Sequence, residues 1–218
     1  MQTAGAPLAT MDHLVLAAIT LADGIDYVAS LTGAVPHPGG KHVTMGTHNA
    51  LLRLGDKLFV EVIAIDPTAP KLARARWFGL DGIALQAELQ ESPRLIHWVA
   101  RTRDLDSAAR RSGVELGPVH ALERGDYRWR ITIPDDGALP GKGLIPTLIQ
   151  WDVPAHPADA LPKSPVSLIE LAGTHPDPNA VRGVLAKLGL ERDLRVTYDR
   201  EPKLAAMLRT PKGIVTFS

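Results

Sequence analysis

The sequence has no cysteine, which excludes disulfide bonds, a thiolate nucleophile and thiolate metal ligands. Its 24 basic residues balance 24 acidic ones, so it carries no electrostatic signature of a nucleic-acid or anionic-membrane partner. It also lacks an apolar run long enough to span a bilayer, and its start lacks the charged-then-apolar order of a signal peptide. We therefore expect a cytoplasmic protein that binds neither nucleic acid nor membranes.

Three segments of the chain share one order of signals: an apolar strand pattern, an amphipathic helix pattern and a glycine. Further strand patterns follow each helix, so each segment is predicted to form a strand, a helix and about three strands. Repetition of this kind usually dictates the architecture. The predicted first strands begin near Met11, Leu95 and Val166, and the helices are expected to end at Gly33, Gly113 and Gly189.

This repetition divides the chain into three units and two connections. The first unit is residues 1–66, a linker with a helical stretch is 67–93, and the second unit is 94–153. A proline-rich tether, 154–165, then leads to a partial third unit of strand, helix and strand at 166–218.

Two local predictions matter for the site. Residues 37–41, with two adjacent glycines, are expected to form a flexible loop that covers it. The later strands of the second unit are expected at Val114–Leu116, Arg128–Pro134 and Leu144–Gln150.

One polar, metal-competent side chain interrupts each of four apolar strand patterns. In the first unit these are His13 and Glu61, and in the second unit His97 and Gln150 follow at a similar spacing. A buried strand is normally apolar, so four matched interruptions across two repeats predict one shared site.

Strand alternation predicts which side chains face that site. His97 shares a face with Arg101, so both are expected to point into a cleft. By the same argument Glu61 and Gln150 face the cleft, whereas Trp151 takes the opposite, helix-packed face.

Five stretches of the sequence resemble a known family. They are Asp12–Val15, Gly46–Leu51, Phe59–Ile63, Pro146–Asp152 and Thr210–Val215. Together they resemble the vicinal oxygen chelate superfamily, which contains glyoxalases, bleomycin resistance proteins and extradiol dioxygenases, and in particular its glyoxalase-like-domain branch. The resemblance implies an α+β fold of tandem βαβββ modules that form a curled mixed sheet with a cleft, to which the third unit adds a partial module.

The resemblance also implies a metal site. Metal-dependent members take one ligand from the first and one from the last strand of each module, which here are His13, Glu61, His97 and Gln150. Such a set would suit Zn²⁺, Ni²⁺, Fe²⁺ or Mn²⁺ without an organic cofactor, and Glu61 would be a ligand or the catalytic base. Gln150 departs from the glyoxalase I pattern, which has Glu there, and this argues against classical glyoxalase I activity.

Four further side chains are candidates for binding substrate. His48 and Asn49 belong to a resembling stretch, although Asn49 could equally satisfy backbone groups in a turn. Trp77 would form a wall of the cleft or part of the core. Arg101 could hold a carboxylate.

Two classes of function stay open. The first is a divalent-metal-dependent lyase or isomerase acting on a small oxygenated substrate chelated in the cleft. The alternative is a metal-free protein that binds or sequesters a small molecule, drug or toxin in the same cleft. Ring cleavage on Fe²⁺ is disfavoured because Gln150 replaces the expected carboxylate. The oligomeric state is open, although these folds often pair into homodimers.

Overall fold

A computed structural model describes residues 8–218. The first unit contains β1 (Ala9–Ala17), α1 (Leu21–Thr32), β2 (His37–His42), β3 (Thr47–Gly55) and β4 (Leu58–Ile65). The linker contains α2 (Ile83–Glu91), and the second unit contains β5 (Arg94–Thr102), α3 (Leu105–Ser112), β6 (Val119–Arg124), β7 (Tyr127–Thr132) and β8 (Thr147–Trp151). The tether carries α4 (Pro157–Ala160), and the third unit contains β9 (Ser167–His175), α5 (Pro178–Leu188), β10 (Arg195–Tyr198), β11 (Lys203–Thr210) and β12 (Gly213–Phe217).

The helices of the three units begin and end at capping residues. Thr20, Asp104 and Asp177 each accept a hydrogen bond from a backbone N–H of the first helical turn. The predicted glycines follow each helix with positive φ, a conformation that costs glycine little. Local sequence therefore sets the helix bounds.

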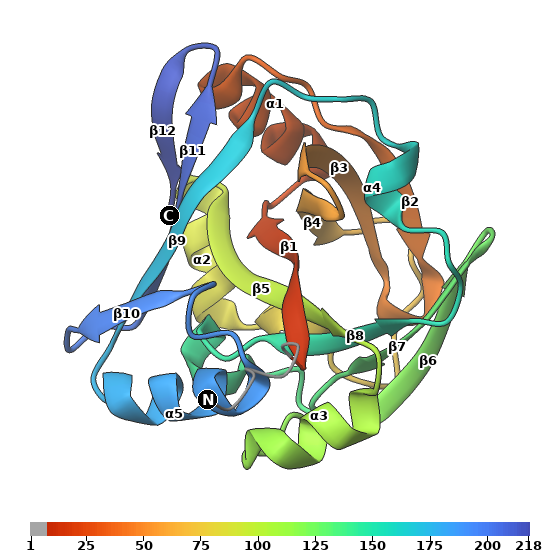
Figure 1. Cartoon of the computed structure of the whole chain (residues 1–218). Coiled ribbons are helices and arrows are strands. Elements are labelled where there is room, and N and C mark those ends of the chain that lie inside the picture. The colour runs from red at the N-terminus through yellow and green to blue at the C-terminus, as the bar shows by residue number, and fades with distance from the viewer. Residues whose placement is uncertain (1–7) are drawn as a thin grey trace.

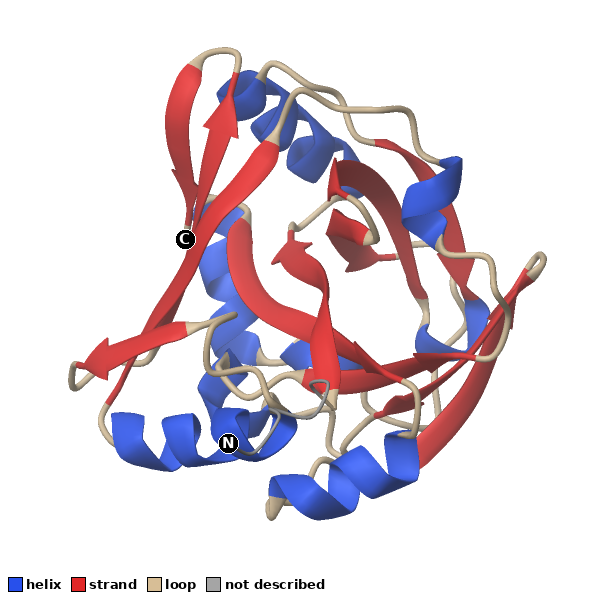
Figure 2. Ribbon diagram, in the orientation of Figure 1, coloured by secondary structure: helices blue, strands red, loops and turns tan. Residues whose placement is uncertain are grey.

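The first two units build one curled sheet of eight strands, in the order β2-β3-β4-β1-β5-β8-β7-β6. Within each unit the first and last strands pair in parallel, and β1 and β5 join the two units antiparallel. Figure 2 shows the strands wrapping around a central space. Strands from both units thus form the concave face of one sheet.

Both faces of this sheet are covered. On the concave face, Val15, Ile63, Val99 and Ile149 belong to one buried cluster that also contains aromatic residues. On the convex face, alternate residues of the same strands pack against helices and the third unit in a second cluster. Because the central strands β4, β1 and β5 are buried on both sides, hydrophobicity alone does not distinguish their two faces.

The third unit forms a separate sheet of four strands, in the order β10-β9-β11-β12. It has the element order of the other units but a different pairing, because its first strand lies between β10 and β11 instead of beside its last strand. It lies outside the large sheet (Figure 1) and shares the convex core with it.

Two sequence expectations near the site are wrong. Residues 37–41 are not a flexible loop but lie in β2, which pairs with β3. The strand expected at Val114–Leu116 lies later in the chain, as β6. This strand forms a hairpin with β7, and its residues alternate between exposed and half-buried. Among residues 8–218, no helix is long and apolar enough to span a membrane.

Candidate functional site

A pocket lies on the concave face of the large sheet. Aromatic and aliphatic side chains dominate its lining, with a few polar groups between them. The lining residues are His13, His42, Asn49, Leu51, Phe59, Glu61, Trp77, Phe78, Arg124, Trp129, Ile131, Ile149, Trp151 and Pro157. Apolar walls with a few polar groups between them are typical of sites that bind small molecules.

At one side of the cavity, a buried carboxylate orients His13. The register between β1 and β5 shifts between Met11 and His13. Asp12 therefore lies at a β-bulge and has no directly opposite residue in β5. Asp12 Oδ1 lies 2.6 Å from His13 Nδ1, and Phe59 stacks on the His13 ring with centroids 4.6 Å apart. His13 therefore donates through Nδ1 and leaves Nε2 toward the cavity.

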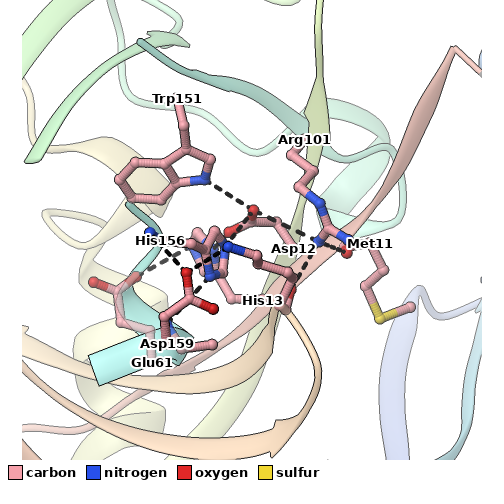
Figure 3. A network of polar contacts seen from close by, with 10 residues as sticks. Met11, Asp12, His13, Glu61, Arg101, Trp151, His156 and Asp159 are labelled. Carbon is pink, nitrogen blue, oxygen red and sulfur yellow. Dashed lines mark hydrogen bonds and ion pairs between the residues drawn. The ribbon is translucent and has the colours of Figure 1, made fainter. Parts of the chain in front are cut away.

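Asp12 is held by donors from distant segments (Figure 3). The indole N–H of Trp151 and Nε2 of His156 each lie 3.0 Å from its Oδ2. His156 Nδ1 accepts from the N–H of Ala158, so Nε2 carries the proton that His156 donates. Arg101 adds a positive charge 3.8 Å from the same oxygen.

These contacts keep Asp12 ionised. Burial by itself would raise the pKa of Asp12, but the hydrogen bonds from His13 and His156 outweigh it and hold the pKa well below its usual range. This carboxylate behind His13 fixes the orientation of its imidazole ring.

Glu61 faces His13 from the neighbouring strand. Glu61 Oε2 lies 3.6 Å from His13 Nε2, and Asn49 Nδ2 donates to Glu61 Oε1 at 2.6 Å. A lone pair on Nε2 and a carboxylate oxygen repel each other unless a proton or a ligand donor lies between them. The pair is thus arranged to exchange a proton with a molecule in the cavity.

Asn49 links this pair to Arg124. Its Oδ1 accepts from Arg124 Nη1 and from the N–H of Gly40, both at 3.0 Å. Arg124 Nη1 also lies 3.3 Å from His42 Nε2. Burial lowers the pKa of His42 to about 4, so this ring is a neutral acceptor near pH 7.

The structure does not bring the four expected metal ligands together. His13 and Glu61 adjoin, but both nitrogens of His97 are engaged: Nδ1 lies 3.0 Å from the Gly143 carbonyl oxygen, and Nε2 accepts from the N–H of Thr147 at 3.1 Å. His97 is fully buried, which lowers its pKa to about 3.

Gln150 takes the face opposite to the one we expected. Gln150 lies opposite Arg130 of β7, and its Oε1 accepts from the N–H of Leu105 at the start of α3. Its neighbours Ile149 and Trp151 line the cavity instead. Within residues 8–218, no group of three or more His, Cys, Asp or Glu side chains is placed to hold a metal ion. These donors, as placed, do not fit the metal site that the resemblance implied.

The substrate-binding candidates also divide. Asn49 and Trp77 line the cavity, whereas His48 follows the opposite parity of β3 and is not among the lining residues. Arg101 lies behind Asp12, where its Nη1 donates to the carbonyl oxygens of Met11 and Lys57.

Sequence reasoning missed Asp12, His156 and Arg124. A charged residue directly before His13 in an apolar strand was a usable signal for Asp12. His156 lies in the proline-rich tether and Arg124 in an unrecognised hairpin, so only the folded chain brings them to the site.

The chain resembles known proteins over most of its length. The model of the glyoxalase-like domain family matches residues 11–189. No curated protein matches the sequence. A hypothetical protein from Staphylococcus aureus has 13% identity and a TM-score of 0.59, with 96% of this chain and 98% of that chain covered. The expected fold class, an α+β vicinal oxygen chelate fold with a curled mixed sheet, is thereby confirmed.

Two epimerase structures are also similar. Methylmalonyl-CoA epimerase from Mycobacterium tuberculosis has 18% identity, with 69% of this chain and 92% of that chain covered and a TM-score of 0.40. The Streptomyces coelicolor enzyme in complex with 2-nitronate-propionyl-CoA has 18% identity, with 68% and 97% covered and a TM-score of 0.41.

Proposed function

Since the chain belongs to the glyoxalase-like domain family, whose fold does not fix one activity, we propose its function from the cavity. The protein is an enzyme of the lyase or isomerase type that moves a proton next to a carbonyl group of a small oxygenated substrate. The observation that carries this proposal is the 3.6 Å approach of His13 Nε2 to Glu61 inside an aromatic cavity.

His13 and Glu61 would share the proton transfer. One of them takes a proton from the carbon beside the carbonyl, and the electron pair moves to the carbonyl oxygen as an enolate. Returning a proton to the same or another carbon completes an isomerisation, and loss of a leaving group completes an elimination. Asp12 holds the His13 ring through Nδ1, so that Nε2 faces the substrate.

Trp77 offers a donor for the developing oxygen charge. Its ring lines the cavity, and its indole nitrogen is buried with no hydrogen-bond partner among residues 8–218. A buried donor without a partner costs free energy, and a substrate oxygen would satisfy it. We therefore propose that Trp77 binds the substrate through this N–H.

The test is hydrogen exchange next to a carbonyl. Purified protein, treated with EDTA, is incubated in D₂O with a panel of 2-oxo acids, 2-oxo aldehydes and aryl ketones, and ¹H NMR follows loss of the C–H signal. We expect accelerated exchange for members that fit the cavity. His13→Ala and Glu61→Gln should each lower the rate by about 100-fold or more.

His175→Gln, in the small sheet, is the matched control and should keep the wild-type rate. The proposed reaction uses His13 and Glu61 without a metal ion. Exchange that appears only after addition of Zn²⁺, Ni²⁺, Fe²⁺ or Mn²⁺ would contradict it and favour a metal-dependent enzyme. Exchange that survives both variants would remove His13 and Glu61 from the reaction.

The second candidate function is metal-free binding or sequestration of a small molecule. The predominance of aromatic and aliphatic residues in the cavity lining favours it. Thermal stabilisation of the EDTA-treated protein by an aryl ligand, without exchange for any panel member, would support this function over the enzyme.

A further inference from the structure

Arg124 brings a positive charge to the cavity without a negative partner. Its Nη1 donates to Asn49 Oδ1 and His42 Nε2, both neutral acceptors. Among residues 8–218, no carboxylate lies within ion-pair distance of Arg124. A partly buried guanidinium in this setting retains an unbalanced charge.

Asn49 keeps Arg124 apart from the nearest carboxylate of the site. Its amide oxygen faces Arg124 and its amide nitrogen faces Glu61, so the side chain separates the cation from the anion. Three partners fix this amide orientation, because the N–H of Gly40 also donates to the oxygen. The arrangement leaves Arg124 free to bind an anionic group of a ligand.

The sequence of β2 makes room for this arrangement. A Cβ on Gly40 would lie 2.8 Å from Arg124 Cδ, and one on Gly39 would lie 2.1 Å from Asn49 Oδ1. Side chains at these positions would therefore collide with Arg124 and Asn49. Glycine at both positions is consistent with a need to hold these two groups in place.

Arg124 also lies where the cavity meets the surface. It lines the inner cavity, a groove with Lys41 and Glu123, and a second groove with His37 and Tyr127. A ligand group bound to Arg124 would thus lie at the opening, with the rest of the ligand inside.

We propose that the substrate is a carboxylic acid with an apolar or aromatic body, and that Arg124 binds its carboxylate. The Nε–Nη2 edge of Arg124 makes no hydrogen bond to residues 8–218 and matches the two oxygens of a carboxylate. The negative charge of Glu61 disfavours the reverse orientation, so the reacting carbon faces His13 and Glu61. This placement of the carbon rests on the proposed function, whereas carboxylate binding does not.

The test compares an acid with its neutral amide. Isothermal titration calorimetry measures the affinity of 4-phenylbutyrate and 4-phenylbutyramide for the full chain. We expect the acid to bind at least about tenfold tighter, as for one charge-assisted bidentate contact. Arg124→Gln should bring the two affinities together, and Arg124→Lys should give an intermediate preference.

Arg128→Gln is the matched control, since Arg128 is exposed on the same hairpin beside Glu123, and it should keep the preference. Equal affinities in the wild type, no detectable binding of the acid, or a preference that survives Arg124→Gln would each overturn the inference. Glu61→Gln separates the two proposals: it should stop exchange while the acid preference remains. If the wild-type protein prefers the acid over the amide but catalyses no exchange, the proposed enzyme activity is refuted and carboxylate binding by Arg124 is retained.

Discussion

At the scale of single residues, the same residue type takes different roles according to its partners. His13 and His97 both interrupt apolar strands on the concave face of the sheet. His13 has one nitrogen on Asp12 and the other facing Glu61, whereas His97 spends both nitrogens on backbone groups and Thr147. The first is free for chemistry, and the second holds β5 against the Gly143–Thr147 segment.

His97 predicts how stability depends on pH. Burial lowers its pKa from 6.5 to about 3, so below pH 6.5 the unfolded chain gains a proton that the folded chain does not. Its contribution to stability is therefore complete above pH 6.5 and is lost as the pH falls toward 3, at about 1.4 kcal/mol per pH unit.

Urea unfolding between pH 7 and pH 4 checks this prediction. His97→Gln should reduce the pH slope of the unfolding free energy by about one proton, even if it lowers stability at every pH. The exposed His37→Gln variant is the control and should leave the slope unchanged. An unaltered slope in His97→Gln would show that this residue does not stay neutral on folding.

At the scale of elements, β2 shows how backbone spacing positions a side chain. Gly39 and Gly40 let this strand lie close to Asn49, which in turn holds Glu61. The two adjacent glycines favoured a loop in the sequence, but pairing with β3 outweighs that local preference.

Gly39→Ala should therefore damage the site from outside the cavity. The new methyl group would displace Asn49, cost about 1–3 kcal/mol of stability, and slow proton exchange by loosening Glu61. Gly55→Ala, at the end of β3 where no atom lies within 4 Å of the added carbon, should change neither. Unimpaired exchange in Gly39→Ala would show that Asn49 does not position Glu61.

At the scale of the whole molecule, the third unit contributes to the core that supports the site. Phe217 on β12 is fully buried in the convex cluster, and the N–H of Leu95 on β5 donates to the carbonyl oxygen of Ser218. The small sheet thus closes the outside of the strand that carries His97 and Arg101. We expect the two sheets to unfold together.

Phe217→Ala tests this coupling. It should cost about 3–5 kcal/mol, and the loss should appear in tryptophan fluorescence, because all four tryptophans lie between residues 77 and 151. Ile214→Ala on the same strand, with the side chain 62% exposed, should stay within about 0.5 kcal/mol of the wild type. A tryptophan transition that Phe217→Ala leaves unchanged would mean that the third unit unfolds by itself.

The sequence by itself determined the elements whose signals are local. The capped helices, the first strands of all three units, and the polar residues His13 and Glu61 follow from periodicity, caps and glycines. The family resemblance added the curled sheet. These features were predictable because hydrophobic period and capping act within a few residues.

Only the tertiary structure decided which polar residues meet. Both faces of β8 are covered, so its sequence does not show that Trp151, and not Gln150, lines the cavity. Asp12 accepts a hydrogen bond from His156, which is 144 residues away along the chain. Asn49 accepts one from Arg124 of the other unit. The pairing of the third unit was equally hidden. These contacts join distant segments through the curl of one sheet, and no local pattern records that curl.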